Sequence, residues 1–517
     1  AVAQMLAYGL FLARLNSENS AVTLRNARDF VPTSFQLIRE LVDFLSVLEQ
    51  KEYSQVRWVV EEVLSIVNSL DLLAIHEDLS FRHRKATSKK LRAMNEEEHR
   101  LFERDPFIYF YEDFLNHYDK DTRKSRGVYY TPPPIVSFIV RAVDDILKDS
   151  FGIKDGLADH QRVTVLDFAC GTGTFLLEVF QRIFENIGGA NAGIADLIVR
   201  EHLLKNIYGF EYLIAPYTIA HLKLSQYLRE QQLPLKDGER LKVYLTNTLE
   251  PMEPQKDLLM PAVTAEAEAA HAIKEQPILV IIGNPPYSGH SKNKGKWITS
   301  QIGKYREGFP ELSRQGQGKW LQDDYVKFIR FAQLKMDGGN FEFSDEKGHP
   351  QTVRISGAEE GVVAIITNHS FLDNPTFKGM RRSLLASFNR IHVLDLHGNS
   401  NKKEISPDGS RDQNVFDIKQ GVAVTLFIKN KKLEKQFLHC DIWGDRIKKY
   451  RATAATAPKD ISWRELTPVA PNYLFKPVTS TDEEVFNSFV SIPQIFAPSG
   501  APAPGFVTTQ DKFAISF

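Results

Sequence analysis

The sequence VLDFACGTGTF occupies residues 165–175, and it decides the fold predicted for this chain. A short apolar run ends at Asp167, two glycines separated by one residue follow, and a stretch with helical periodicity comes next. Glycine permits a tight turn and lets a ligand approach the backbone at the start of a helix. Leu176 stands where a dinucleotide fingerprint would have its third glycine. Taken alone, the segment is either a ligand-binding turn or a structural connection from strand to helix.

From about residue 163 onward, short apolar runs alternate with amphipathic stretches. This alternation is typical of an α/β fold with a mostly parallel sheet. The last two apolar runs have little helix between them, which favours an antiparallel hairpin at the sheet edge. Helices are expected at 175–187 and 214–229. The predicted strands are 163–168, 206–210, 241–245, 278–282, 361–366, 391–396 and 422–428.

Three further regions differ in texture from this alternating part. Residues 1–125 show helical spacing of apolar side chains, with a predicted apolar face of Met5, Leu6, Leu10, Leu12 and Leu15 on the first helix. Residues 288–335 carry ten Lys and Arg against four Asp and Glu, which suggests either a DNA-facing loop or a solvated basic loop. Residues 397–420 are polar and predict a mobile loop. After about residue 452 the chain is rich in proline, as linkers are.

Composition excludes several classes of protein. The 517 residues include 64 basic and 65 acidic side chains, so the chain is not basic throughout, and contacts with nucleic acid must come from local patches. Two cysteines cannot build a disulfide scaffold, nor can they alone ligate a structural zinc ion. No apolar run approaches the ~20 residues of a membrane span. We therefore expect a cytoplasmic protein without membrane contact. Because the chain begins at Ala1, we expect it to be part of a longer polypeptide.

Two later motifs add chemistry to the glycine turn. Glu211 ends the strand predicted at 206–210, where a carboxylate can accept hydrogen bonds from both hydroxyls of a ribose. The sequence NPPY follows the strand predicted at 278–282 and comprises Asn284, Pro285, Pro286 and Tyr287. Proline removes donors and fixes the backbone, so carbonyl groups are left to accept. The motif can therefore hold a planar amino group with two acceptors while the tyrosine ring stacks on the group that bears it.

The order GVYYTP (127–132), DFACGTGTF (167–175), GFE (209–211) and NPPY (284–287) resembles the S-adenosylmethionine-dependent adenine-N6 DNA methyltransferases of the gamma type. The upstream sequences AQMLAYGLFLARL and DPFIYFYEDFLNHYDKDTRKSRGVYYTP look like the coupler region of Type ISP restriction-modification enzymes. These enzymes combine nuclease, ATP-driven translocase, methyltransferase and target-recognition domains in one polypeptide. The resemblance implies a Rossmann-like methyltransferase sheet behind an N-terminal helical domain. It divides the chain into a coupler at 1–125, a methyltransferase at 126–455, and a linker with the start of a recognition domain at 456–517.

The resemblance also implies roles for the residues that match these motifs. Asn284, Pro285, Pro286 and Tyr287 would be catalytic, acting on an adenine flipped out of duplex DNA. Glu211 would hold the cofactor ribose. Many relatives carry Asp at the position of Asn247, and Asn accepts with less charge assistance. Cofactor-binding roles are implied for Tyr130, Thr131, Pro132, Asp167, Ala169, Gly171, Gly173, Phe175, Glu211, Asn247 and Leu249. No metal is implied.

Two other functions were weighed against site-specific DNA methylation within a restriction-modification enzyme. A protein glutamine methyltransferase would also use NPPY, because the motif holds any planar amide or amine. The GVYYTP segment and the long region beyond residue 288 speak against it. A non-catalytic DNA-binding subunit would not need an intact glycine turn together with an intact NPPY. The expected partners are double-stranded DNA and nuclease, ATPase and target-recognition domains of the same polypeptide.

Overall fold

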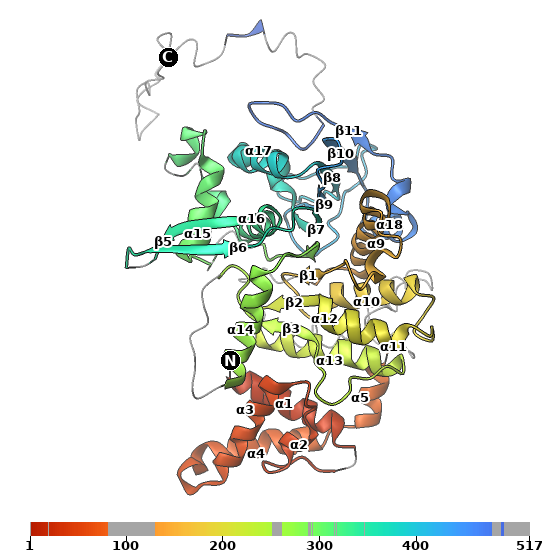
Figure 1. Cartoon of the computed structure of the whole chain (residues 1–517), viewed down its shortest axis with the longest axis vertical. Coiled ribbons are helices and arrows are strands. Elements are labelled where there is room, and N and C mark those ends of the chain that lie inside the picture. Colours follow the sequence, from red (N-terminus) through yellow and green to blue (C-terminus); the bar gives the residue numbers. More distant parts are fainter. Residues whose placement is uncertain are drawn as a thin grey trace. The chain divides into compact units, whose positions relative to one another are not determined.

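The computed structural model describes residues 2–18, 20–80, 130–250, 261–287, 291, 293–314, 316, 318–345, 347–477 and 488–490 (Figure 1). Residue contacts divide the chain into two units, Ala1–Phe475 and Lys476–Phe517. Every helix and strand named below belongs to the first unit. Parts of the predicted coupler and of the predicted recognition domain, residues 81–125 and most of 478–517, lie outside the described residues.

A nine-stranded sheet forms the centre of the first unit, in the order β11-β10-β8-β9-β7-β4-β1-β2-β3. Neighbouring strands run parallel except at β9, which is antiparallel to β7 and β8, and at β11, which is antiparallel to β10. A separate antiparallel pair is formed by β5 and β6. The strands are β1 (Val165–Asp167), β2 (Ile207–Glu211), β3 (Lys242–Leu245), β4 (Val280–Gly283), β5 (Gly339–Ser344), β6 (Pro350–Ile355), β7 (Gly361–Asn368), β8 (Arg390–Asp395), β9 (Val422–Lys429), β10 (Gln436–Asp441) and β11 (Arg464–Glu465).

The predicted α/β class with a mostly parallel sheet is confirmed, and each predicted strand coincides with an observed one within a few residues. The antiparallel pairing of the last two predicted strands is also confirmed. Their predicted place at the sheet edge is wrong, because β9 inserts between β7 and β8 and β10 extends the sheet further. The continuous apolar run of β9 suits such a central strand, since almost all of its side chains are buried.

Helices cover both faces of the sheet, and alternate residues of each strand enter two separate apolar cores. Val165 joins one core with α9, α10 and α13, whereas Leu166 joins the other with α14, α16 and α17. Among the described residues, no helix combines the length and apolar character that a membrane span requires. These covering helices are α9 (Pro133–Phe151), α10 (Thr174–Asn186), α13 (Ile214–Glu230), α14 (Pro261–Glu275), α16 (Asp324–Asp337) and α17 (Lys378–Ser387).

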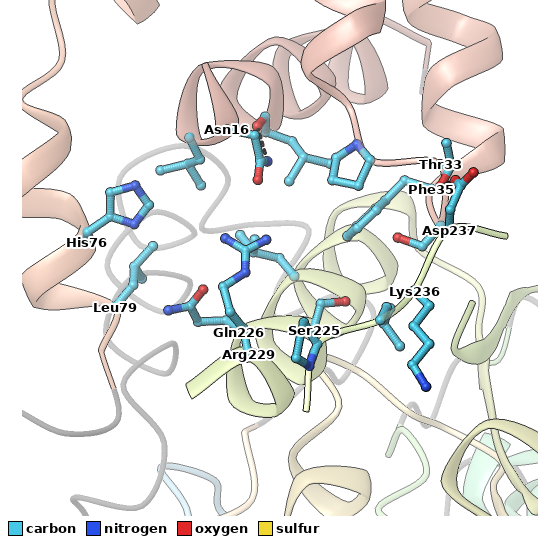
Figure 2. Close-up of a pocket in the computed structure, with 17 residues that line it drawn as sticks. Asn16, Thr33, Phe35, His76, Leu79, Ser225, Gln226, Arg229, Lys236 and Asp237 are labelled. Atoms are coloured by element: carbon cyan, nitrogen blue, oxygen red, sulfur yellow. Dashed lines mark hydrogen bonds between the residues drawn. The ribbon is translucent and has the colours of Figure 1, made fainter. Parts of the chain in front are cut away.

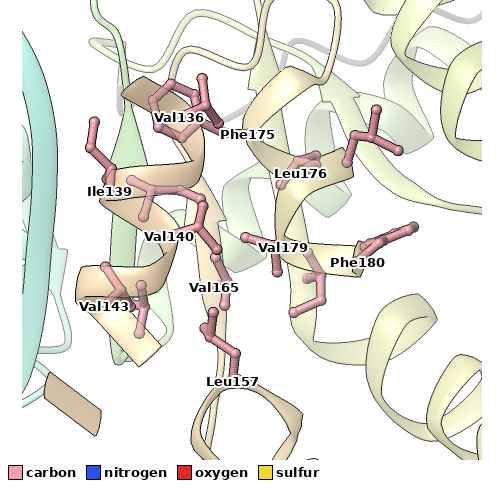
Figure 3. Packing of buried hydrophobic residues seen from close by; sticks show 14 of the residues in the cluster. Val136, Ile139, Val140, Val143, Leu157, Val165, Phe175, Leu176, Val179 and Phe180 are labelled. Carbon is pink, nitrogen blue, oxygen red and sulfur yellow. The ribbon is translucent and has the colours of Figure 1, made fainter. Parts of the chain in front are cut away.

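The packing of α9 against α10 supports the strand that carries the glycine turn (Figure 3). Proline at the first two positions of α9 suits a helix start, where the missing N–H groups have no intrahelical partner. Val136, Ile139 and Val140 of α9 and Phe180 of α10 are all at most 1% exposed. Their burial holds both helices against the face of the sheet that contains Val165.

The N-terminal helices form one contact unit with the sheet. Leu10, Leu12 and Leu15 of the predicted apolar face are buried, and Leu6 is partly buried. Leu15 packs with Ile219 of α13, and the two helices are in contact. The helical prediction is therefore confirmed for the described residues up to 78. These helices are α1 (Val2–Asn16), α2 (Ala27–Phe30), α3 (Gln36–Asp43), α4 (Ser54–Asn68) and α5 (Leu72–Asp78).

The basic segment 288–335 is not the loop that its charge suggested. Its described residues include α15 (Lys296–Gly303), several short 3-10 turns and most of α16. Trp297, Tyr305 and Tyr325 are at most 3% exposed and belong to the apolar core, while Trp320 is 49% exposed. Three of these four aromatic side chains are thus structural.

Residues 397–420 lack regular secondary structure, as predicted for a loop, apart from a single bridge between Ile405 and Arg411; the mobility of the loop stays a prediction. Much of this loop is buried, including Asn414 and Phe416. The Tyr450 hydroxyl donates to the Val415 carbonyl over 2.6 Å, which ties the loop to helix α18 (Arg446–Ala455). This hydrogen bond therefore fastens the loop to α18.

Replacing Phe180 by Ala should lower the free energy of unfolding by about 3–5 kcal/mol, because it leaves a cavity between α10 and its neighbours. Urea unfolding followed by circular dichroism measures this loss. Trp58→Ala is the control, since Trp58 is 61% exposed and should change stability by less than about 0.5 kcal/mol. Equal losses in the two variants would contradict the described core.

Candidate functional site

The predicted site residues gather at the carboxyl ends of β1, β2 and β4. Asp167 at the end of β1 lies opposite Gly209 of β2 and Ile282 of β4 in the parallel ladders. The chain reverses its direction across the sheet between β1 and β4, because β2 and β3 lie on one side of β1 and β4 on the other. In open α/β sheets, ligands bind at such a switch point, outside the carboxyl ends of the strands.

Glu211 is joined directly to the glycine turn. One carboxylate oxygen accepts from the Gly171 amide over 2.8 Å, and the other accepts from the Leu213 amide over 2.6 Å. Gly171 and Gly173 adopt φ values of 55° and 78°, which favour glycine. A Cβ at Gly173 would approach Ala220 of α13 to 3.1 Å, whereas a Cβ at Gly171 would meet nothing within 4 Å. The two glycines thus have different tasks: one allows close helix packing and the other borders open space.

Asp167 is fully buried beneath this turn. Its Oδ1 accepts from the Ala169 amide over 3.2 Å, and its Oδ2 has no hydrogen-bond partner among the described residues. Burial raises the pKa of the Asp167 carboxyl to about 8, and the nearby Glu211 charge acts in the same direction. A buried carboxyl with an unused oxygen is costly unless a ligand supplies a donor.

Lys223 of α13 supports the turn from behind. Its ammonium group is buried and lies 3.3 Å from the Thr172 hydroxyl and 3.2 Å from the Thr174 hydroxyl. The sequence analysis did not single out this residue. Its position on the apolar stripe of the predicted helix 214–229 is a signal that could have found it, because a buried lysine needs specific partners.

Asn247 lies in the turn after β3 with its side-chain amide fully engaged. Its Oδ1 accepts from the Leu249 amide over 3.1 Å, and its Nδ2 donates to Glu250 and to Asn293 Oδ1, each over 3.0 Å. Lys274 of α14 donates to the carbonyls of Asn247 and Glu250, both over 2.7 Å. Burial lowers the pKa of Lys274 to about 8. The Lys274 and Asn293 contacts, which the sequence analysis missed, hold this turn in place.

The NPPY motif follows β4 directly and is tied to the GVYYTP segment. The Asn284 Nδ2 donates to the Thr131 hydroxyl over 2.9 Å, and the Asn284 Oδ1 accepts from the Tyr287 hydroxyl. Tyr287 also donates to the Ile366 carbonyl at the end of β7 over 3.3 Å. The orientation of the Asn284 amide is thus set from both ends.

The Tyr287 ring packs edge-on against Phe416, with ring centroids 6.4 Å apart and planes at 76°. Burial raises the pKa of the Tyr287 hydroxyl well above its ordinary value, so the hydroxyl remains protonated and a donor. Phe416 belongs to the 397–420 loop, which therefore covers one side of the motif.

The structure brings together most of the residues predicted for the site, while a few support it from the core. Hydrogen bonds join Thr131 to Asn284 on one side, and Asp167 and Glu211 to the glycine turn on the other. Phe175 and Leu249 are buried, at 4% and 1% exposure, so their side chains pack behind the site. Pro132 is buried before α9, and residues 126–129 lie outside the described part of the chain.

A cavity of about 320 Å³ lies elsewhere, between the N-terminal helices and α13 (Figure 2). Leu15, His76 and Arg229 are among its lining residues. It shares no residue with the glycine turn or with NPPY. Helix α13 thus presents Lys223 to the glycine turn and Ser225 and Gln226 to this cavity. We do not assign the cavity to the site.

Residues 102–324 match the family model described as N-6 DNA Methylase. These residues make up less than half of the 517-residue chain, and the similarity to this family is shown for that part. The match contains the glycine turn, Glu211 and NPPY, so it covers the edge of the sheet at which these motifs meet. A search of curated protein sequences finds no match.

Solved structures share the fold over nearly the whole chain. The Type ISP restriction-modification enzyme LlaBIII bound to DNA matches with a TM-score of 0.65 and 24% identity over 93% of this chain. The DrdV–DNA complex matches with a TM-score of 0.64 and 21% identity over 93% of this chain. A nuclease-deletion mutant of the Type ISP enzyme LlaGI with a DNA substrate mimic matches with a TM-score of 0.65 and 21% identity over 94%. This chain covers 29%, 41% and 35% of those chains, respectively.

The raised pKa of Asp167 predicts a pH-dependent stability. In the unfolded chain an aspartate has a pKa of about 3.9. Between about pH 4 and pH 8 the folded chain therefore keeps a proton on Asp167 that the unfolded chain has released. The free energy of unfolding should therefore fall as pH rises through this window. In Asp167→Asn the fall should be smaller, because the amide does not titrate.

Urea unfolding of both proteins at pH 5 and pH 8 measures this difference. Parallel losses in the wild type and in Asp167→Asn would contradict the raised pKa.

Proposed function

We propose that this chain transfers a methyl group from S-adenosylmethionine to the N6 amino group of adenine in duplex DNA. The observation that carries the proposal is the placement of NPPY beside the glycine turn, with the Asn284 amide oriented by Thr131. The N-6 DNA methylase match over 102–324 supports the same chemistry.

The residues at the sheet edge fit S-adenosylmethionine. The unused, buried Oδ2 of Asp167 can accept from a donor such as the ammonium group of the cofactor. The space beside Gly171 is open, so the backbone of the turn is accessible to a ligand. We infer that Tyr130, Thr131 and Pro132 border the methionine end of the cofactor, while Asp167, Ala169, Gly171 and Gly173 surround it and Phe175 supports the turn.

Glu211 and Asn247 are proposed to hold the nucleoside part of the cofactor. The Glu211 carboxylate accepts from the Gly171 and Leu213 amides, and a carboxylate at this strand end can also accept from ribose hydroxyls. Both amide hydrogens of Asn247 are used within the chain and its Oδ1 already accepts from the Leu249 amide, so the second lone pair of Oδ1 is proposed to accept from the adenine amino group. Leu249 contributes from the core through its backbone and its apolar side chain.

When bound, S-adenosylmethionine supplies an electrophilic methyl group. The task of the chain is to make an adenine amino nitrogen nucleophilic, because its lone pair is delocalised into the ring. The Asn284 Oδ1 and the Pro285 carbonyl accept hydrogen bonds from that amino group and draw it toward tetrahedral geometry. Since the methylated nitrogen becomes acidic, it releases its proton after attack and no strong base is required. Positioning therefore supplies most of the rate.

The target adenine must leave the duplex to reach Asn284. Tyr287 is proposed to stack on the flipped base, and Pro286 limits the backbone between the two residues. In the structure the Tyr287 hydroxyl bonds Asn284 Oδ1. The second lone pair of this oxygen, or a movement of the Tyr287 ring, allows the amino group to bind.

The chain covers less than half of each of the three structures named above, so its place in a larger enzyme is also a proposal. We infer a Type ISP-like arrangement, with residues 1–125 as coupler, 126–455 as methyltransferase and 456–517 as the path to a target-recognition domain. The matched structures contain DNA or a DNA mimic, which supports duplex DNA as partner. Nuclease and ATPase activity would come from other domains of the same polypeptide.

Incubation of the 517-residue chain with tritiated S-adenosylmethionine and mixed-sequence duplex DNA tests the proposed function. Label in N6-methyladenine after nucleoside analysis is the expected result. Label in glutamine side chains of added protein would support a protein methyltransferase instead. Binding of DNA without any label transfer would support a non-catalytic subunit.

Asn284→Ala should abolish label transfer and leave S-adenosylmethionine binding nearly unchanged, because the residue acts on the base. Filter assays of tritium in DNA and calorimetry of cofactor binding measure the two effects. Asn340→Ala, on the exposed face of β5, is the control and should retain both. Loss of cofactor binding in Asn284→Ala would show that this residue belongs to the cofactor site.

Gly171→Leu should eliminate cofactor binding by filling the open space beside the turn. Gly152→Leu is a matched control, because Gly152 ends α9 with φ of 64° and a Cβ there also meets nothing within 4 Å. Both substitutions cost about 1–2 kcal/mol of left-handed strain. Calorimetry should show binding in Gly152→Leu alone. Equal affinity in both variants would remove the cofactor from this turn.

A further inference from the structure

A second group of chemically active side chains lies beyond the ends of β7 and β8. His369, His397 and Glu404 each offer one ligand atom, and these atoms lie within 4.8 Å of one another. Glu404 Oε1 is 4.0 Å from His369 Nε2 and 3.8 Å from His397 Nδ1. The two histidine side chains are 1% and 4% exposed, and the glutamate is 14% exposed. None of the three takes part in the proposed methyl transfer.

Each histidine of this cluster is held by a carboxylate on its other ring nitrogen. His369 Nδ1 lies 2.9 Å from Asp395 Oδ1, and His397 Nε2 lies 2.7 Å from Asp441 Oδ1. The remaining nitrogen of His369 lies near Glu404, and that of His397 lies 3.8 Å from Glu404 Oε1 and 3.7 Å from Asp395 Oδ2. Histidines that ligate metals are typically oriented by a carboxylate in this way. A single pair of a histidine and a carboxylate is common in proteins. Here the histidines of two such pairs converge on Glu404, and together the three side chains form a preoriented ligand set.

The contact with Asn399 defines the tautomer of His369. The Asn399 Nδ2 lies 3.2 Å from His369 Nε2, and because the amide group is a donor, Nε2 is the accepting nitrogen. The proton of His369 is thus on Nδ1 and is donated to Asp395. An imidazole with its lone pair on Nε2 is in the state in which histidine ligates a metal ion, and here that lone pair accepts from the Asn399 side-chain amide.

The charge around the cluster also favours a cation. With neutral imidazole rings, the carboxylates of Asp395, Glu404 and Asp441 lie together in a mostly buried region. The ammonium of Lys449 interacts electrostatically with Asp395 and Glu404, but its direct contacts lie elsewhere: it is 2.8 Å from Asp412 Oδ1 and donates to the Leu396 carbonyl over 2.6 Å. A divalent ion between His369, His397 and Glu404 would offset this negative charge.

We propose that His369, His397 and Glu404 bind one zinc ion. Two imidazole nitrogens and one carboxylate oxygen are a ligand set that zinc takes, with water as fourth ligand. The separations of 3.8 and 4.0 Å exceed the ligand spacing of a tetrahedral site, so zinc would draw the three side chains inward and displace the Asn399 side-chain amide. His369 follows β7, while His397 and Glu404 belong to the 397–420 loop. The ion therefore fastens this loop to the sheet.

Zinc at this site would act on the rest of the molecule through the 397–420 loop. Phe416 of the loop contacts the Tyr287 ring. Gly421, at the end of the loop, lies so close to His369 that a Cβ there would approach the ring to 2.4 Å. Zinc bound to His369 and His397 would hold both ends of the loop and thereby keep Phe416 against Tyr287. Its role is structural, and it is independent of the cofactor site.

Calorimetric titration of the chelator-treated 517-residue chain with Zn²⁺ tests the site. The wild type and Glu342→Gln, an exposed control on β5, should bind one zinc ion per chain with equal affinity. Glu404→Gln retains an oxygen that accepts from the Asn399 backbone N–H. This variant should bind zinc at least about 100-fold more weakly, a larger loss of affinity than the removal of an outer hydrogen-bond partner causes. Asp441→Asn alters an outer partner of His397, a carboxylate that also lies 3.5 Å from His439 Nδ1, and should weaken binding by about 10–100-fold.

The melting temperature and the absorption spectrum with Co²⁺ test the zinc site independently. Zn²⁺ should raise the melting temperature of the wild type and of Glu342→Gln but not of Glu404→Gln, and Co²⁺ should give visible absorption bands only in the first two. If Glu404→Gln does not fold, Asp441→Asn decides, because that carboxylate is 35% exposed and its loss should be tolerated. Zinc affinity in the wild type no greater than in the folded variant would overturn the proposal. The carboxylates would then be hydrogen-bond partners of the histidines and nothing more.

Discussion

The parallel pairing of β1 with β2 on one side and with β4 on the other is the constraint on which the remaining structure depends. It aligns Asp167 with Gly209 and Ile282, so the segments that follow these three strands emerge at one edge. Helices bury both faces of the sheet, which leaves the strand ends as the place where polar side chains can meet. Three short motifs far apart in sequence thereby become one site.

The parts of the fold that the sequence predicted are those with a local signal. Apolar runs and the glycine turn identify the central strands and α10, because strand burial and the left-handed turn depend on residues close in sequence. The strands that escaped prediction lack this signal: β10 alternates in burial, and β5 and β6 are largely exposed. The order of β9 within the sheet depends on contacts between distant segments, which periodicity does not report.

The basic segment 288–335 shows why a count of charges wrongly predicted a loop. Lys335 is fully buried in α16, where its ammonium donates to the carbonyls of Ile273 and Lys274 over 3.2 and 2.7 Å. Lys327 is 1% exposed and bonds the Ser291 hydroxyl over 2.7 Å. A charge count treats such residues as solvated, whereas the fold supplies their acceptors from distant positions. Lys223 and Lys274 of the candidate site were missed for the same reason: their partners are known only once the chain is folded.

The candidate site combines a rigid acceptor with a covered tyrosine. Thr131 fixes one end of the Asn284 amide and Tyr287 the other, so the oxygen rather than the nitrogen points away from Thr131. This orientation is the one that can accept from an amino group, and it exists without any ligand because the contacts lie within the chain. Tyr287 in turn rests on Phe416, so its freedom to move is limited by the 397–420 loop. The 397–420 loop is far from the glycine turn in sequence. Through Phe416 it nevertheless contacts Tyr287, one of the residues proposed to act on the base.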